Sequence, residues 1–354
     1  MVLLILQILI SSFLVFTWIP LVKLDYWWIR IFDYPRFQKL LVLGALLVFW
    51  IIFGRHEDWF WGWTIAVVVS MGYLSFLVWP YSIFGKKMIK KVSYDPHRGI
   101  HLIVGNIFQY NRKYNKALSL FQQNDPDVIF LVETDQAWID ALKPLHSTYE
   151  NQILLPLENT YGLALFSKFP IVRKEILYLV DKEIPSLEID LQLRNGEIIT
   201  MYAIHPTPPV PGENLTSAER DAEILIVGKK SKANPLPSMV IGDLNDVAWS
   251  QSTSLFLKIS ELADPRRGRG FFSTFHATYP FFRWPLDHIF LSHHFGLSRI
   301  KVLRNIGSDH FPIELMAILT KKDTTDTDSA SHEEQVEARA KILKGHENQK
   351  SQSI

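Results

Sequence analysis

The sequence predicts an α/β protein in which two β-sheets pack into a layered sandwich, preceded by two or three transmembrane helices. Hydrophobic residues make up 48% of the 354 residues, and the excess is concentrated in residues 1–85. From Val92 onward, short β-branched runs alternate with runs of helical periodicity, a pattern typical of a layered α/β domain. After Thr320 the chain becomes polar and charged, which predicts a segment without a core of its own.

The first 85 residues contain three apolar segments. Residues 1–22 carry no charged side chain and, as a helix, are long enough to cross a bilayer core of about 30 Å. Residues 59–85 are also uncharged, whereas residues 40–54 are apolar over only 15 positions and either span the bilayer or lie buried or re-entrant. Tryptophan and tyrosine gather at the segment ends, as in interfacial aromatic belts. A signal peptide is not indicated, because residues 1–22 have neither a basic leader nor a small-residue cleavage site.

Basic residues indicate an orientation. The loop after the first segment carries Lys23, Arg30, Arg36 and Lys39. With three spans, this loop and the lysines of residues 86–91 share one side, which the positive-inside rule makes cytoplasmic. The domain that follows would then be cytoplasmic. If the middle segment does not span, the domain can instead lie on the opposite side of the membrane. The absence of cysteine fits a reducing or an oxidising compartment equally well.

The remaining chain divides into three predicted parts. Residues 86–98 form a short basic juxtamembrane linker close to anionic headgroups. Residues 99–320 form the α/β domain, and residues 321–354 form a disordered charged tail in which a transient helix over 333–343 is possible. Helices are predicted over residues 114–123 and, from a capping box at Thr216 and Glu219, over 216–230. Strands are predicted over residues 100–107, 128–132, 163–166, 187–193, 198–204, 239–241, 287–291 and 311–319.

Polar side chains follow several of these strands. In MVIGDLNDVAWS, residues 239–250, Asp243 and Asn245 share one face because alternate strand residues point the same way. A carboxylate beside an amide suits a hydrated cation and a phosphate oxygen. Taken singly, each residue also suits a structural role, such as an Asx turn or a core histidine. Their common placement at strand ends, where α/β sheets bind ligands, favours a functional site that also includes Asn106, Glu133, His205, Asp287, Asp309 and His310.

Seven stretches in this order resemble the endonuclease/exonuclease/phosphatase superfamily, which includes DNase I, apurinic endonucleases, neutral sphingomyelinases and inositol-polyphosphate 5-phosphatases. The resemblance covers roughly residues 99–319 and implies a DNase I-like, four-layer sandwich with the active site at one edge and Mg2+ or Mn2+ as cofactor. The matching stretches are IVGNI, NDPDVIFLVET, YGLALFSKFPI, YAIHPTPP, IGDLND, RWPLDHIFLS and GSDHFPI.

The resemblance also implies a metal site and a water-activating group. Glu133 would be the principal metal ligand, with Asn106 and Asp309 near the ion. Asp243 would orient or deprotonate the attacking water, and Asn245 would hold a phosphate oxygen. Phosphate ester hydrolysis needs a cation, an activated water and an acid for the leaving oxygen, so carboxylate, amide and imidazole groups suit it. Oxygen ligands without cysteine favour Mg2+ or Mn2+ over a structural zinc.

Two histidines complete the implied site. His310 would pair with Asp287, which fixes the imidazole tautomer while the ring faces the phosphate. His205 would stabilise charge on the phosphorane or protonate the leaving oxygen. The superfamily pattern has a glutamate that pairs with this histidine, whereas the aligned position here is Thr160, with Glu158 two residues away as a possible substitute.

The sequence leaves the substrate open. Residues 92–320 contain 25 Asp and Glu against 22 Lys and Arg, whereas a nonspecific nuclease is expected to have a basic surface. A membrane-tethered, endonuclease-type phosphodiesterase is the first hypothesis, and a phosphohydrolase of a phospholipid or small phosphate ester, similar to a sphingomyelinase or inositol phosphatase, is the alternative. An inactive scaffold is disfavoured by the complete residue set. Candidate substrate contacts are Arg267, in a basic loop at 266–269 whose glycines indicate a mobile loop beside the site or else a solvated loop, and Arg283 and Trp284. The sequence does not allow a protein partner to be predicted.

Overall fold

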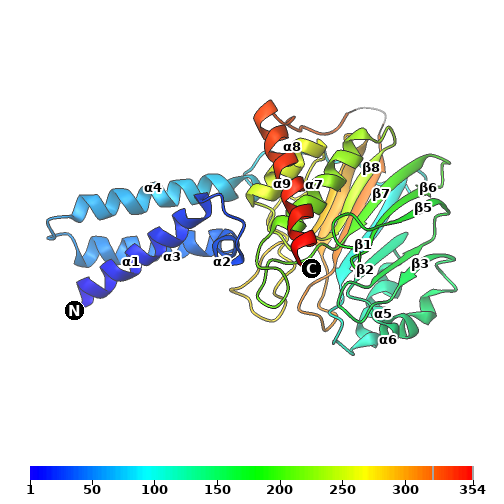
Figure 1. Cartoon of the computed structure of the whole chain (residues 1–354), viewed down its shortest axis with the longest axis horizontal. Helices are drawn as coiled ribbons and strands as arrows, with labels where there is room; N and C mark the ends of the chain where they lie inside the picture. The colour runs from blue at the N-terminus through cyan, green and yellow to red at the C-terminus, as the bar shows by residue number, and fades with distance from the viewer. Residues whose placement is uncertain (321–322, 353–354) are drawn as a thin grey trace.

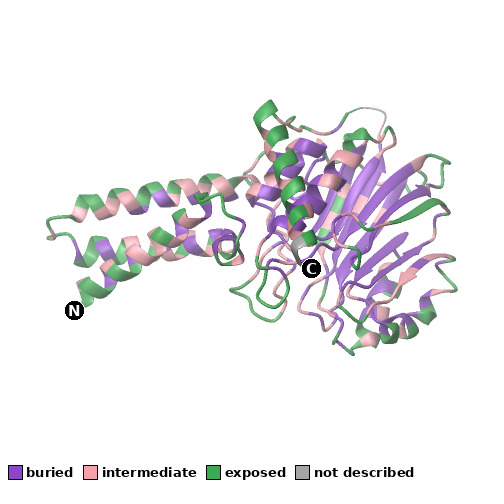
Figure 2. Ribbon diagram, viewed as in Figure 1, coloured by how far each residue is buried: buried purple, intermediate pink, exposed green. Residues whose placement is uncertain are grey.

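Three long apolar helices form a bundle at the amino-terminal end of the chain (Figure 1). The computed structural model describes residues 1–320 and 323–352. Helices α1 (Val2–Trp18), α3 (Arg36–Phe53) and α4 (Phe60–Val78) lie in segments that are each long and apolar enough to cross a membrane. The middle segment reaches 18 residues because the helix begins at Arg36 rather than at residue 40. The bundle buries a small core around Trp50 and exposes apolar side chains on its outer faces (Figure 2).

The end of the bundle nearest the α/β domain is built from short helical turns. They are η1 (Ile19–Leu21), α2 (Trp27–Arg30), η2 (Ile31–Asp33) and η3 (Trp79–Tyr81). The chain therefore runs toward the domain in α1, away from it in α3 and back in α4 (Figure 1). The amino terminus and the α3–α4 connection both lie at the far end of the bundle.

Two mixed sheets face each other in the second part of the molecule. The six-stranded sheet has the order β10 (Phe295–Val302), β11 (Ile313–Leu319), β1 (Gly99–Asn106), β2 (Val128–Val132), β4 (Leu163–Ser167) and β3 (Asn151–Leu155). The five-stranded sheet has the order β5 (Ile171–Leu177), β6 (Ser186–Gln192), β7 (Ile198–Ile204), β8 (Ser238–Asp243) and β9 (Asp287–Leu291). The main hydrophobic core fills the space between the sheets, so the predicted two-sheet sandwich is confirmed (Figure 2).

Helices cover the outer face of each sheet and complete four layers (Figure 1). On the six-stranded sheet, α5 (Tyr114–Asn124), α6 (Gln136–Ala141) and the turn η4 (Lys143–Leu145) bury Leu120 and Trp138 against the strands. On the five-stranded sheet, α7 (Ala218–Ala233) and α8 (Gln251–Ser260) bury Leu225 and Phe256. β1 pairs with β2, and β7 with β8, in parallel, so the carboxyl ends of each pair reach the same edge of their sheet.

Several sequence predictions differ from the structure at the edges of these elements. Strands β3, β5 and β10 are absent from the predicted set; β3 and β5 are edge strands, and the central residues of β5 are all exposed, so it shows no alternation of buried and exposed positions. α7 begins at Ala218 with Ser217 as its N-cap, two residues after the predicted start. Thr216 and Glu219 still contact each other, at 3.4 Å between their side-chain oxygens.

Within the described part of the chain after residue 320, a long helix replaces the predicted disordered tail. Residues 332–352 form α9 (His332–Gln352), which packs on α7. The contact needs little apolar surface, because small side chains let the helices approach closely and only Ala338 is buried in the core. Charge pairs supply the rest: Lys341 lies 2.8 Å from Asp221, and Lys344 lies 2.6 Å from Asp25.

The linker is also part of the fold. Met88 and Ile89 are buried in the main core, and the backbone amide of Val92 donates to the carbonyl of Leu297 at 2.9 Å. The segment therefore runs along the domain surface rather than as a free tether.

Candidate active site

The carboxyl ends of β1 and β8, one from each sheet, bring Asn106 and Asp243 together. The Asn106 Nδ2 atom donates to Asp243 Oδ2 at 3.0 Å and to Glu133 Oε1 at 2.6 Å. Glu133 directly follows β2, the parallel neighbour of β1. One amide thus joins two carboxylates, as the strand-end pattern in the sequence predicts. Asn106 and Asp243 are buried, whereas Glu133 is partly exposed.

Glu133 is held in an unusual backbone conformation and a poorly solvated position. Its φ of 62° lies in the left-handed region, which a residue with a side chain rarely adopts. Its Oε2 atom accepts from the backbone amide of Gln109 at 3.0 Å. Burial raises the pKa of Glu133 to about 7, and the hydrogen bonds to Asn106 and Gln109 oppose this shift only in part. A buried carboxylate of this kind is stabilised by a nearby cation.

His310 lies between two buried carboxylates. Its Nδ1 atom is 2.8 Å from Asp287 Oδ2, and its Nε2 atom is 3.6 Å from Asp243 Oδ2. Burial opposes the charge on the imidazole, but Asp287 and Asp243 outweigh it and raise the pKa of His310 to about 10. The loop is fixed by Ser308, whose hydroxyl donates to the Asn106 carbonyl at 2.8 Å and accepts from the His310 amide at 3.0 Å.

Asn245 is positioned from both parts of the molecule. Its backbone amide donates to Asp243 Oδ1 at 3.0 Å, and its side-chain amide donates to the Pro206 carbonyl at 3.0 Å. Its own carbonyl accepts from the Tyr34 hydroxyl at 2.8 Å and from Arg220 Nη1 at 2.7 Å. The junction between the bundle and the domain consists of η1, α2, η2, residues 34–35 and η3. Tyr34 belongs to it, so the junction directly contacts the backbone of the site.

His205 follows β7 and is buried, and burial lowers its pKa to about 4. Its Nδ1 atom has no hydrogen-bond partner among the described residues. Glu158 is exposed, and its carbonyl accepts from the Gln109 side chain. The neighbour of the imidazole is instead Tyr161, with 5.4 Å between ring centroids, and the Tyr161 hydroxyl donates to Glu213. A tyrosine–glutamate pair therefore stands beside the histidine where the resemblance implies a glutamate alone.

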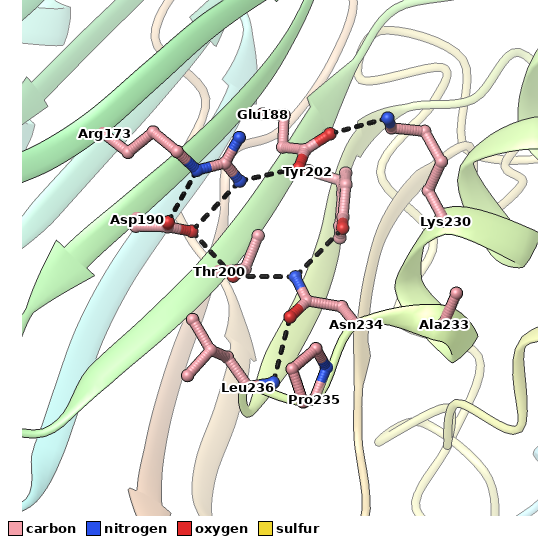
Figure 3. A pocket seen from close by; sticks show the side chains of 10 residues that line it. All are labelled: Arg173, Glu188, Asp190, Thr200, Tyr202, Lys230, Ala233, Asn234, Pro235 and Leu236. Atoms are coloured by element: carbon pink, nitrogen blue, oxygen red, sulfur yellow. Dashed lines mark hydrogen bonds and ion pairs between the residues drawn. The ribbon is translucent and has the colours of Figure 1, made fainter.

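A polar cavity elsewhere on the domain is no candidate for this chemistry. It measures about 440 Å3 and lies near the start of β7, whereas His205 follows the end of that strand. Figure 3 shows that its charged groups are paired with one another: Arg173 bonds Asp190 and Glu188, and Glu188 also contacts Lys230. These pairs leave the cavity without a convergent free group.

Comparison with known proteins agrees with the geometry. The sequence profile described as the Endonuclease/Exonuclease/phosphatase family matches residues 106–310, which is more than half of the chain and includes every strand end described above. The chain belongs to the endonuclease/exonuclease/phosphatase family. Members of this family hydrolyse phosphoester bonds, and the chain is a phosphoesterase of this class. No curated protein matches the sequence significantly.

Solved structures of the endonuclease/exonuclease/phosphatase family share the fold. A family protein from Beutenbergia cavernae has a TM-score of 0.51 and 18% identity over 63% of this chain and 72% of its own. The mannosyl-6-phosphatase of Bacteroides thetaiotaomicron has a TM-score of 0.50 and 18% identity over 62% and 100%. The human Nocturnin catalytic domain with bound sulfate has a TM-score of 0.51 and 19% identity over 65% and 97%. At these identities, the comparison supports the DNase I-like fold alone.

The donor set fits the divalent cation on which the family generally depends. Three side chains, Asp243, Asp287 and His310, have potential ligand atoms within 4.8 Å of one another. Asp287 and His310 are already hydrogen-bonded to each other, and a charged imidazole repels a cation. The oxygens of Glu133, with Asn106 and Asp309, are the groups that would hold such a cation.

The predicted substrate contacts have different positions. Arg283 lies over the Phe311 ring at 5.0 Å, next in sequence to His310, and donates to the carbonyls of His276 and Ala277. Trp284 stacks on Phe275, whose ring centroid lies 4.9 Å from that of His310. Both predicted residues therefore flank the site.

The basic loop at 266–269 is not a mobile substrate grip. Arg266 is buried and bonds Asp264 through two nitrogens, Arg267 lies over the Tyr81 ring at 5.6 Å, and Arg269 donates to the Ile89 carbonyl. Arg266 and Arg269 are thus bonded within the protein and Arg267 packs on a ring, which holds the loop in place, whereas substrate contact by Arg267 stays a prediction. Sequence spacing showed a charge cluster but could not show the buried partners.

We expect Arg266→Met to lower the free energy of unfolding by about 3–5 kcal/mol, because it leaves the Asp264 carboxylate buried and unpaired. Denaturant unfolding of the full chain in lipid nanodiscs measures this. Arg304→Met, at an exposed position, is the matched control and should change stability by less than about 0.5 kcal/mol. Unchanged stability together with weaker substrate binding would instead support the mobile-loop interpretation.

Other contributors were missed because they lie in loops and contact the site through bonds that no strand-end pattern indicates. Tyr34, Gln109, Tyr161 and Glu213 support the site from loops. Only Tyr161 carried a signal, since it opens the YGLALFSKFPI stretch.

Proposed function

We propose that the protein is a membrane-anchored phosphoesterase that depends on Mg2+ or Mn2+ and uses water as its nucleophile. The observation that carries this is the Asn106 amide, which joins Glu133 to Asp243 beside the Asp287–His310 pair. Oxygen ligands, a buried base and a charged imidazole are thereby gathered at one edge of the sandwich. The anchor is the bundle of three helices that are long and apolar enough to cross a membrane.

Each side chain has a role that its position supports. Asp243 orients the attacking water and accepts its proton, and Asn245 binds a non-bridging phosphate oxygen. His310, kept charged by Asp287, stabilises the negative charge that develops on the phosphoryl group. His205, whose ring lies 5.4 Å from that of Tyr161 between centroids, assists the leaving oxygen. The cation supplies charge neutralisation at the phosphate when it is bound.

Glu133→Gln should raise the Mg2+ concentration for half-maximal activity by about tenfold or more, because the ion loses its charged ligand. The measurement is a Mg2+ titration of hydrolysis by the full chain. Glu158→Gln, which changes an exposed carboxylate in a nearby loop, is the control and should leave the titration unchanged. An unaltered Mg2+ requirement in Glu133→Gln would remove Glu133 from the metal site.

The pH dependence should respond to Asp287. The pKa of His310 is about 10, so its charge persists below this pH and is lost as the pH rises through it. Asp287→Asn removes an opposite charge, which lowers the pKa of His310, and the alkaline limb of kcat/KM should move down by about one to two pH units. A pH–rate profile measures the shift. A lower rate with an unmoved alkaline limb would mean that the charge on His310 is not required.

Two substrate classes are supported by different observations. Endonuclease-type cleavage is supported by family membership, which includes nucleases. A phosphate ester within the membrane is supported by the contact between Tyr34 of the junction and Asn245 of the site. The test offers plasmid DNA and phospholipid vesicles to the full chain with Mg2+, and bis-p-nitrophenyl phosphate as a general ester. Absence of hydrolysis of all three would contradict the proposed function.

We also propose that the catalytic domain lies in the cytoplasm. The bundle places the lysine-rich residues 86–91 and the loop with Lys23 on the domain side, and the amino terminus with Arg55 on the other. Protease added outside sealed cells or vesicles of the same orientation tests this prediction. The amino-terminal tag should be cleaved, whereas the domain should be protected.

A further inference from the structure

An apolar cavity of about 600 Å3 lies between the junction segment and two loops of the catalytic domain. One wall comes from α2, η2 and the residues up to Pro35, and the others from residues 209–211 and 275–284. Its volume lies within the ordinary range of small-molecule sites, roughly 300–1,000 Å3. Its lining is almost wholly hydrocarbon and aromatic: Trp27, Ile31, Phe32, Tyr34, Val210 and Phe282, with prolines and Trp284.

Two residues in the walls of the cavity also contact residues of the candidate active site. Phe275, in its wall, lies 4.9 Å from the His310 ring between centroids. Tyr34, in the opposite wall, donates its hydroxyl to the Asn245 carbonyl and packs edge-on against Trp284 at 5.7 Å. Residues 209–211 follow His205 by only a few positions. A molecule with its phosphate at Asn245 and His310 can therefore extend an apolar part into the cavity.

The mouth of the cavity exposes apolar side chains near the membrane end of the domain. Ile31 is 51% exposed, Val210 38% and Phe282 60%. Leu215, beyond the loop, is 63% exposed, and its carbonyl accepts from the backbone amide of Trp27 in α2. α2 lies at the end of the bundle that faces the domain (Figure 1). Exposed apolar groups at this level are typical of side chains that enter the bilayer interface.

The chemistry of the walls selects among occupants. A nucleobase carries donors and acceptors along its edge, and burying them here without partners would cost about 1–3 kcal/mol each. The indole nitrogen of Trp284 is itself buried without a partner among the described residues. A hydrocarbon chain needs no partners, and each buried methylene group gains about 0.8 kcal/mol.

We propose that the cavity binds a hydrocarbon chain of a membrane phosphate ester while the phosphate occupies the candidate active site. This inference rests on the proposed phosphoesterase function and specifies its substrate class as a lipid phosphate ester. The chain enters from the bilayer side, between α2 and the loop at 275–284. The bundle thus supplies one wall of the substrate site in addition to anchoring the enzyme.

A chain-length series with one constant reaction tests the proposal. Methyl, butyl and octyl 4-nitrophenyl phosphate carry the same scissile bond: water adds to phosphorus, the bond from phosphorus to the aryl oxygen breaks, and nitrophenolate leaves with an alkyl phosphate. The full chain in nanodiscs is assayed with Mg2+ below the micellar concentration of each ester. We expect kcat/KM to rise by about a hundredfold from methyl to octyl, the gain from burying roughly four methylene groups.

Adjacent phenylalanines provide a matched pair of variants. Phe282 lines the cavity, whereas Phe281 is 82% exposed and is not among the lining residues. Phe282→Ala should reduce the octyl-to-methyl ratio to about tenfold, and Val210→Trp, which narrows the mouth, should reduce it further. Phe281→Ala should keep the wild-type ratio. A variant that only disturbs the structure would lower the hydrolysis of the octyl and the methyl ester together and leave the octyl-to-methyl ratio of kcat/KM unchanged.

The outcomes separate the two proposals. Hydrolysis of all three esters at equal kcat/KM, or a chain-length gain that Phe282→Ala and Val210→Trp leave intact, would overturn the cavity assignment and leave the phosphoesterase function standing. Hydrolysis of none would overturn the phosphoesterase function. In that case, calorimetry that compares the affinities for octyl phosphate and methyl phosphate, corrected with empty nanodiscs, tests the cavity assignment without catalysis. Equal affinity for the two would exclude a site for the hydrocarbon chain.

Discussion

Asp243→Asn is expected to lower kcat/KM by about a thousandfold or more while leaving the domain folded. The carboxylate is the group that the proposed function assigns to accept a proton from water, and general-base catalysis is worth roughly 10²–10⁴-fold. Folding should survive because the substituted side chain keeps its size and its one oxygen can still accept from the Asn245 amide, although the bond from Asn106 Nδ2 to the other oxygen is lost. Burial raises the pKa of Asp243, so removal of its charge also relieves an unfavourable desolvation.

The measurement is hydrolysis of bis-p-nitrophenyl phosphate by the full chain, with thermal unfolding in parallel. Asp190→Asn is a matched control, because Asp190 is also buried but pairs with Arg173 in the polar cavity near the other end of the strands (Figure 3). It should retain activity within about twofold. Activity of Asp243→Asn near the wild-type level would remove Asp243 from the water-activating role, and an unfolded variant would make it a structural residue.

The sequence was sufficient for the parts of the site that depend on local order. Asn106, Glu133 and Asp243 each stand at or directly after a hydrophobic run. Parallel pairing of β1 with β2 brings Asn106 and Glu133 to one edge, and pairing of β7 with β8 brings His205 and Asp243 to an edge of the other sheet. Periodicity and motif order therefore predicted the two-sheet sandwich and the membership of the cluster. They could not give distances between residues from different sheets, which depend on how the sandwich closes.

What sequence reasoning missed depends on partners that are distant in the chain. Arg266 looked like a solvent-exposed charge because Asp264 and His288 are brought to it only by the fold. α9 looked like a disordered tail because its composition is polar, yet Lys341 and Lys344 find buried or half-buried carboxylates. Trp249, four residues after Asn245, gave no sign that its indole donates to the Asp33 carbonyl of the junction.

Deletion of residues 1–85 is expected to destabilise the catalytic domain by about 5 kcal/mol and to lower kcat/KM by about tenfold or more. The junction covers a cluster that includes Val247, Ala248 and Trp249, all buried, and each exposed large side chain costs about 1.5–3 kcal/mol. Tyr81 donates to the Ala248 carbonyl, and Tyr34 supports Asn245. A chain beginning at Lys86 keeps Met88 and Ile89 in the core, so the deletion removes the bundle and the junction without removing these two core residues.

Tyr34→Phe in the full chain separates the local contact from the bulk of the bundle. It removes one hydrogen bond to Asn245, keeps the ring in the cavity wall, and should cost about 1 kcal/mol of stability. Because Arg220 still donates to the same carbonyl at 2.7 Å, its effect on kcat/KM should be smaller than that of the deletion. If a chain beginning at Lys86 melted at the same temperature as the full protein and retained its rate on soluble esters, the bundle would be only an anchor. A loss confined to the octyl ester would instead mean that the bundle contributes the wall of the chain site and nothing to the chemistry.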